Sequence, residues 1–137
     1  MKGMIIDASV AASWLLTDEM SAYADRVLNE MQRGEPVFAP SLWPLEITNV
    51  LFNAERRKRI DKKHRDAALE RVERLPISII TGPSLADLKT IRTLAEKHQL
   101  TAYDAEYLRV AKELQLPLAT QDGNLVAAAR REKVIVF

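Results

Sequence analysis

Short apolar runs alternate with longer segments of helical periodicity along this chain, and this alternation constrains the fold more than any other sequence feature. The runs are mostly apolar and do not alternate regularly with polar residues, and they span residues 4–6, 36–40, 77–80, 118–120 and 134–137. Such strands, separated by helices, are typical of a parallel sheet that is covered on both faces. The sequence therefore predicts an α/β fold with a central, mostly parallel five-stranded sheet.

About seven helices are predicted around these strands, from apolar residues at helical spacing and from capping residues at helix starts. The first helix follows residues 4–6 and ends at about Leu16. The others run from Asp18 or Ser21 to Gly34, from Ser41 to about Arg59, from Asp61 to Leu75, from Ser84 onward, from Thr101 to Gln115 and from Asp122 onward. The helix after Ser84 is expected to bury Leu85, Leu88, Ile91, Leu94 and Ala95. No linker or internal repeat interrupts residues 1–137, which we expect to form one domain.

The composition limits the chemistry available to the chain. A content of 47% hydrophobic and 28% charged residues is typical of a globular protein, and the lack of cysteine excludes disulfides, thiolate zinc sites and cysteine nucleophiles. Any metal must be held by oxygen atoms or by His64 and His98, which we expect to be exposed and assign to no catalytic role. No signal peptide or apolar segment of membrane-spanning length is visible, so we expect a cytoplasmic protein with no membrane association.

Basic residues are concentrated in one stretch, although the formal net charge is only +1. This stretch extends to Arg65 and begins with Arg56, Arg57, Lys58 and Arg59. Clustered Lys and Arg side chains are typical of a polyanion-binding surface, but they also suit the solvated C-terminal end of a helix. The sequence leaves both interpretations open.

Two aspartates follow predicted strands. Asp7 comes directly after residues 4–6, and Asp122 comes soon after residues 118–120. In parallel α/β sheets, groups just beyond the carboxyl ends of strands line the ligand crevice. The structural alternative is that each aspartate caps the helix that follows it, or that Ser9 does so in place of Asp7. A capping side chain accepts hydrogen bonds from the free N–H groups at the start of a helix.

Two further acids lie on helix faces that carry apolar neighbours. Glu46 shares a stripe with Asn49 and Asn53 between two apolar flanks, and Asp104 shares its face with Tyr107. The structural alternatives are a solvated position for Glu46 and a capping role at a helix start for Asp104. The pattern favours a polar cavity that both acids face.

Asp7, Glu46, Asp104 and Asp122 are therefore expected to meet in one crevice. Four carboxylates gathered there repel one another and resist burial unless protons or cations neutralise them. A hard divalent cation with oxygen ligands meets this requirement, and Mg²⁺ or Mn²⁺ suits the ligand set when a phosphate shares the site.

The same residues, taken in order, resemble the motifs of a known family. The segments Ile6–Ser9, Pro44–Asn49, Leu100–Ala105 and Ala119–Asp122 look like those of PIN-domain proteins. More narrowly, they resemble VapC-type toxins of bacterial and archaeal toxin–antitoxin pairs. The resemblance extends from the first predicted strand to the last and includes all four acidic positions.

This resemblance implies a PIN-like nuclease domain over residues 1–137 that acts as a Mg²⁺- or Mn²⁺-dependent endoribonuclease. The implied catalytic and metal-binding residues are Asp7, Glu46, Asp104 and Asp122. The implied supporting residues are Ser9, Asn49 and Thr120, and the RNA backbone is expected to contact Arg56, Arg57, Lys58 and Arg59.

The expected partners are an RNA substrate, a cognate antitoxin and a second copy of the chain in a homodimer. Three aromatic residues are candidates for a dimer or antitoxin surface, or for the core: Trp14, Trp43 and Phe137.

Two other functions fit parts of the sequence. A non-catalytic nucleic-acid-binding or protein-binding module would use the acids as helix caps and the basic stretch as its contact surface. A phosphatase or phospho-acceptor domain would use Asp7 as a nucleophile, but it requires further motif residues, such as an aspartate at the position that Ser9 occupies.

Overall fold

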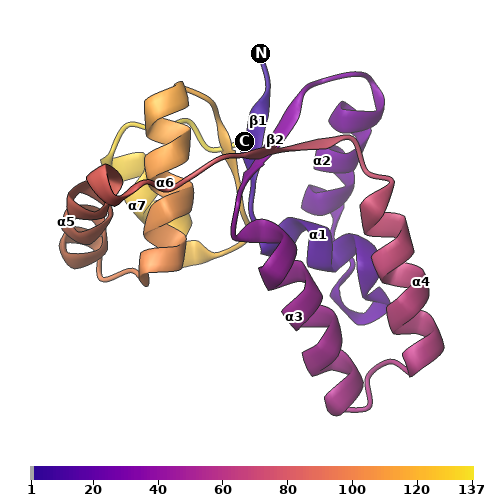
Figure 1. The fold of residues 1–137 in the computed structure, drawn as a ribbon. Coiled ribbons are helices and arrows are strands. Elements are labelled where there is room, and N and C mark those ends of the chain that lie inside the picture. Colours follow the sequence, from indigo (N-terminus) through magenta and orange to yellow (C-terminus); the bar gives the residue numbers. More distant parts are fainter. Residues whose placement is uncertain (1) are drawn as a thin grey trace.

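Four strands form one parallel sheet in the order β3-β2-β1-β4 in the computed structural model, which describes residues 2–137 (Figure 1). The strands are β1 (Met4–Ile6), β2 (Val37–Pro40), β3 (Ile77–Ile80) and β4 (Leu118–Ala119). In the register, Met4 lies opposite Val37 and Ile6 lies opposite Ala119. The predicted parallel α/β architecture is confirmed.

The predicted fifth strand, residues 134–137, is wrong. This segment meets the sheet only through an isolated parallel bridge between Val136 and Leu118. The Leu118 amide donates to the Ile135 carbonyl at 2.8 Å, and the Phe137 amide donates to the Leu118 carbonyl at 3.0 Å. The C-terminal segment thus pairs with β4 at a single position and does not extend into a ladder.

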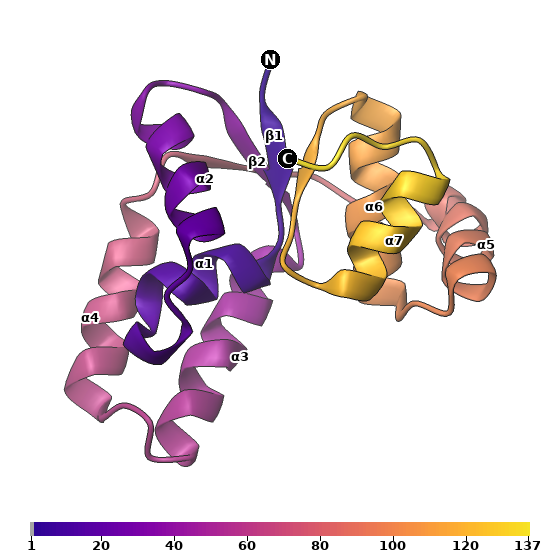
Figure 2. The same ribbon diagram turned by 180° about the vertical axis from the view of Figure 1, so that it is seen from behind.

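The seven predicted helices are present within the described residues. Two short 3₁₀ turns, η1 (Thr17–Glu19) and η2 (Leu85–Asp87), accompany α1 (Ala8–Leu15), α2 (Ala22–Gln32), α3 (Trp43–Arg56), α4 (Lys62–Glu73), α5 (Leu88–His98), α6 (Ala102–Leu114) and α7 (Gly123–Arg131). Helices α1 to α4 lie on one side of the sheet and α5 to α7 on the other (Figures 1 and 2). None of the helices between residues 2 and 137 combines the length and apolar character needed to cross a membrane.

Capping residues explain several helix boundaries. Ser21 caps α2 by accepting a hydrogen bond from the Ala24 amide, and Asp61 caps α4 through the His64 amide. The prediction that Ser41 begins α3 is wrong, because its hydroxyl donates to the Gly82 carbonyl instead of capping the helix.

Helix α3 also ends earlier than predicted, at Arg56 instead of Arg59. Lys58 adopts a left-handed backbone conformation with φ of 60°, which ends the helix. The Lys58 amide then donates to the Glu55 carbonyl and the Arg59 amide to the Ala54 carbonyl, both at 2.9 Å, so the last turn is closed by hydrogen bonds.

The predicted buried face of α5 is only partly correct. Ile91 and Leu94 are buried, whereas Leu85 is 87% exposed and Leu88 is 52% exposed. Residues 85–87 form a 3₁₀ turn closed by a Ser84–Asp87 capping box, so the α-helical stripe begins later than the sequence pattern indicated.

The core surrounds β1 and includes buried residues from helices on both sides of the sheet. All three residues of β1 are fully buried, and α6 contributes Tyr107 and Leu108 as fully buried side chains. Helix α6 also contacts β1, β2 and β4. The centre of the core is therefore directly behind the carboxyl edge of the sheet, where the acidic residues lie.

Truncating a core residue of α6 is expected to destabilise the fold much more than truncating an exposed leucine. Leu108→Ala should lower the free energy of unfolding by about 3 kcal/mol, because it leaves a cavity in a fully buried site. Leu85→Ala, the matched control, should change it by no more than about 0.5 kcal/mol. Urea unfolding monitored by circular dichroism measures both, and equal losses would contradict this assignment of the core.

Candidate functional site

Asp7 lies where β1 ends and α1 begins. It is the N-cap of α1, and its Oδ1 accepts hydrogen bonds from the amides of Ser9 at 3.0 Å and Val10 at 3.3 Å. The Ser9 hydroxyl donates to the same oxygen at 2.6 Å. The capping role considered from the sequence is therefore real, and it holds the carboxylate at the edge of the sheet.

Strand β4 supplies the partner of the second Asp7 oxygen. Because Ile6 and Ala119 are paired, the residues that follow them are adjacent, and the Thr120 hydroxyl donates to Asp7 Oδ2. Asp7 is only 6% exposed. Burial raises the pKa of its carboxyl group, although the hydrogen bonds from Ser9, Thr120 and Val10 oppose this shift.

Asp122 is positioned by the same threonine. Its amide donates to Thr120 Oγ1 at 3.0 Å, and its own Oδ1 caps α7 by accepting from the amides of Asn124 at 2.9 Å and Leu125 at 3.1 Å. Thr120 thus connects two of the predicted acids through one hydroxyl group.

Glu46 lies in the first turn of α3 and faces α6. Its Oε1 accepts a hydrogen bond from the hydroxyl of Tyr107, which is 1% exposed. Burial raises the pKa of Glu46 most, and the charges of Asp104 and Asp7 raise it further, whereas the hydrogen bond from Tyr107 lowers it. The solvated position considered for Glu46 is therefore not observed.

Asp104 lies in the first turn of α6 and is half-buried. Burial raises the pKa of its carboxyl group, and the charge of Asp122 raises it further. The charges of Asp7 and Asp104 act on Glu46 in turn. The structure therefore places the four acids, which come from separate elements, near one another at the carboxyl edge of the sheet.

The chemistry of this group fits a hard divalent cation. All donors are carboxylate oxygens, and within residues 2–137 none of the four acids forms a salt bridge with a basic side chain. Their side chains do not yet close around an ion, since no three His, Cys, Asp or Glu groups among these residues are close enough to hold a metal. Binding would require side-chain adjustment.

Two side chains that the sequence did not assign to the site support it. Tyr107 is on the same helical face as Asp104, a relation visible in the sequence, but its contact with Glu46 joins two helices far apart in the chain. Gln121 connects the β4–α7 loop to α1, because its Nε2 donates to the Ser9 carbonyl at 3.1 Å and to Ser13 Oγ at 2.7 Å. No sequence signal distinguishes Gln121.

Asn49 has no such link to the acids. It is exposed on α3, and its side chain forms no hydrogen bond with any residue in the range 2–137.

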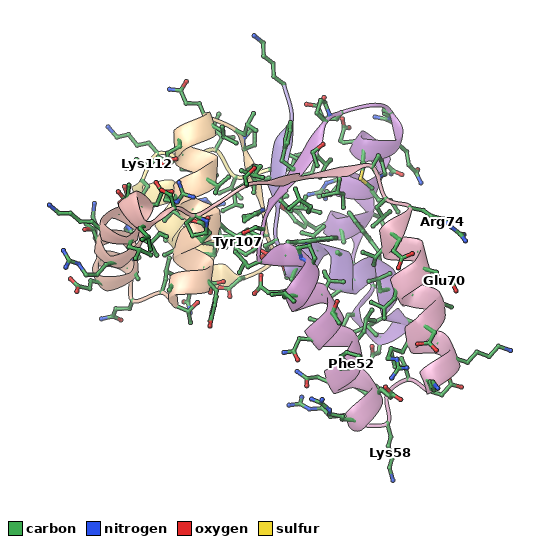
Figure 3. The ribbon with its side chains drawn as sticks, viewed as in Figure 1. Phe52, Lys58, Glu70, Arg74, Tyr107 and Lys112 are labelled. Atoms are coloured by element: carbon green, nitrogen blue, oxygen red, sulfur yellow. The ribbon has the colours of Figure 1, made fainter. Side chains whose placement is uncertain are left out.

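The predicted RNA-binding residues differ in their freedom to bind RNA. Arg59 is held by salt bridges to Asp18 at 2.8 Å and Glu19 at 2.6 Å. Lys58 projects into solvent at the end of α3 that lies away from the sheet (Figure 3). Arg56 and Arg57 are also exposed.

The expectation that both histidines are exposed is wrong. His98 is buried, and its Nε2 lies 2.7 Å from Glu132 Oε2. His64 is half-buried, and its Nε2 lies 3.1 Å from the Leu15 carbonyl. Neither histidine contacts an acid of the site.

The three aromatic candidates for an interaction surface pack against the core instead. Trp43 is 3% exposed and donates its indole N–H to the Asp7 carbonyl at 3.2 Å. Trp14 and Phe137 are half-buried against the core, and the Phe137 ring meets the Tyr23 ring edge to face.

Comparison with known proteins identifies the family to which this arrangement belongs. The family model for the PIN domain matches residues 4–131, a span that includes all four acids. The chain belongs to the PIN-domain family. A curated relative, Ribonuclease VapC3 from Pyrobaculum aerophilum, is 27% identical over 122 residues, which cover 89% of this chain and 91% of the relative.

Solved structures show the same PIN fold. PAE2754 from Pyrobaculum aerophilum aligns with a TM-score of 0.71 and 25% identity, covering 92% of this chain and 84% of that one. FitAcB from Neisseria gonorrhoeae aligns with a TM-score of 0.69 and 21% identity over 98% and 96% of the two chains. VapBC2 from Rickettsia felis, bound to a promoter DNA fragment, aligns with a TM-score of 0.71 and 12% identity over 98% and 97%.

Removing the Tyr107 hydroxyl is expected to weaken cation binding without unfolding the protein. Tyr107→Phe removes the hydrogen bond that orients Glu46, and the loss of such an orienting group typically costs about tenfold in metal affinity. Calorimetric titration with Mn²⁺ measures the affinity, and circular dichroism verifies the fold. Tyr103→Phe, which changes an exposed tyrosine on the same helix, is the control. Equal Mn²⁺ affinity in Tyr107→Phe and wild type would rule out this positioning role.

Proposed function

We propose that this PIN-domain protein is a Mg²⁺- or Mn²⁺-dependent endoribonuclease that hydrolyses RNA phosphodiester bonds, and that residues 1–137 form one nuclease domain. The observation that carries the proposal is the convergence of four carboxylates without basic counterions at the carboxyl edge of a PIN-type sheet. The relative named Ribonuclease VapC3 supports the same class of reaction.

The acids have different roles in this proposal. Asp7 and Asp104 would be the main residues that hold the metal, and Glu46 and Asp122 would hold a second ion or orient the attacking water. When bound, the cation neutralises charge on the phosphate and the leaving oxygen and lowers the pKa of a water molecule.

The surrounding side chains keep these acids in position. Ser9 and Thr120 fix both oxygens of Asp7, and Tyr107 holds Glu46.

Water attacks in line with the leaving oxygen, so no protein nucleophile is needed. The products carry a 5′-phosphate and a 3′-hydroxyl group, and a 2′,3′-cyclic phosphate would contradict this scheme.

We propose further that the protein is the toxin of a type II toxin–antitoxin pair, acts in the cytoplasm and forms a homodimer. Structures similar in fold include FitAB bound to a DNA fragment and VapBC2 bound to its promoter DNA. A cognate antitoxin that covers the acidic site would keep the nuclease inactive.

Cleavage of a structured RNA pool tests the nuclease proposal. Wild-type protein should cut in Mg²⁺ or Mn²⁺ and not in EDTA, whereas Asp7→Asn and Asp104→Asn should each lower the rate at least about a hundredfold, equivalent to roughly 2.7 kcal/mol of transition-state stabilisation. Asp25→Asn, which changes an exposed acid on α2, is the matched control and should retain activity. Folded, antitoxin-free protein that is inactive with either metal would favour the alternative, a non-catalytic binding module.

RNA affinity tests the role of the basic stretch. Replacing Arg56, Arg57 and Lys58 by glutamine should weaken binding of single-stranded RNA, because each phosphate contact releases counterions. The plot of log affinity against log salt concentration should become less steep, with the magnitude of its slope reduced by about 2 if all three side chains contact phosphates. Arg59→Gln should leave the slope nearly unchanged, because that side chain is paired with Asp18 and Glu19. An unchanged slope in the triple variant would exclude these contacts.

A further inference from the structure

A groove between α1 and α3 begins beside the acidic site. Ala8 and Ser9, which are among its lining residues, directly follow Asp7, and the Ser9 hydroxyl donates to Asp7 at 2.6 Å. The groove has a volume of about 270 Å³. Helix α1 packs against α3, and the two lie side by side in Figure 2. A chain held at the acids could therefore continue into this groove.

The walls of the groove combine small apolar surfaces with the polar side chains of Ser9, Glu19, Asn53, Arg57 and Arg59. Ala8, Ala12 and Val50 provide the apolar surface, and Asn53 and Arg57, one helical turn apart on α3, provide an amide and a guanidinium group. Ligand pockets typically combine apolar walls with a few polar groups that fix the orientation of the ligand.

The side chains of Asn53 and Arg57 are available to a ligand. Within residues 2–137 the side-chain nitrogen of Asn53 has no hydrogen-bond partner, and the side-chain oxygen Oδ1 accepts only a long contact of 3.4 Å from Arg56. Arg57 forms no salt bridge within that range, whereas Arg59, which also lines the groove, is neutralised by Asp18 and Glu19. The groove therefore offers one free cation and one free amide.

We propose that this groove is a base-reading subsite for single-stranded RNA, in which Asn53 recognises an adenine that flanks the scissile phosphate and Arg57 contacts the adjoining phosphate. The inference rests on the proposed ribonuclease function for the placement of the scissile bond. Bases of single strands are free to present their edges to side chains. An asparagine amide carries both a donor and an acceptor, which matches the acceptor N7 and donor N6 of adenine.

Changing the amide to a carboxylate should change the preferred base. An ionised aspartate side chain only accepts hydrogen bonds. It therefore lacks the donor that would contact adenine N7, but it can accept a hydrogen bond from the N4 amino group of cytosine. Asn53→Asp should therefore move the preference from adenine to cytosine, a change that general loss of structure would not produce.

Binding of short fluorescent oligoribonucleotides of A, C, G or U, measured by anisotropy in EDTA, tests the subsite. Wild type should bind the A oligomer about tenfold more tightly than the C oligomer, as expected for one two-point base contact. Asn53→Ala should bring this ratio close to one, and Asn53→Asp should invert it. Asn29→Ala, which changes an exposed asparagine on α2, should retain the wild-type ratio.

The experiment separates this inference from the nuclease proposal, because binding in EDTA does not require cleavage. Asn53-dependent preference for A in a protein that never cuts RNA would support the subsite and refute the proposed function. Equal affinity of wild type for the four oligomers, no measurable binding, or a preference that survives Asn53→Ala would overturn the subsite, even if the protein cleaves RNA with metal.

Discussion

Each of the four acids lies at the start of a helix, and the acidic site depends on this arrangement. Asp7 and Asp122 are the N-caps of α1 and α7, while Glu46 and Asp104 lie in the first turns of α3 and α6. The free N–H groups and partial positive charge of a helix N-terminus favour carboxylates there. Burial nevertheless raises the pKa of Asp7, Glu46 and Asp104, and repulsion from neighbouring acids raises the pKa of Glu46 and Asp104 further, so helix ends offset only part of the cost. The remaining cost is what a bound cation would relieve.

The four acids differ in how firmly the protein holds them. Both oxygens of Asp7 accept hydrogen bonds from the protein, and one oxygen of Asp122 is committed to the start of α7. Glu46 accepts one hydrogen bond, from Tyr107, and Asp104 is half-buried. Asp7 and Asp122 are therefore held more firmly than Glu46 and Asp104. This difference is consistent with four acids that lie near one another without forming a metal site within residues 2–137.

The parts of the fold that follow from local sequence were predictable. Apolar runs and capping residues gave the parallel sheet and the seven helices, and strand ends and helix faces pointed to the four acids. The failure of residues 134–137 to form a strand was not predictable, because it depends on how this segment pairs with Leu118, which lies elsewhere in the chain. The exposure of Leu85 and the neutralisation of Arg59 depend on a 3₁₀ turn and on acids about forty residues away in the chain. The Tyr107–Glu46 contact depends on the packing of two distant helices.

The acids are divided equally between the two helical groups that flank the sheet. Asp7 and Glu46 belong to the side formed by α1 to α4, and Asp104 and Asp122 belong to the side formed by α5 to α7 (Figures 1 and 2). A cation bound by acids from both groups would join them like a cross-link. Because a ligand that binds only the folded state adds stability in proportion to the logarithm of its concentration, the cohesion of the two halves would then follow the supply of free metal. The resistance of this chain to unfolding would thus respond to the ionic composition around it as well as to its own contacts.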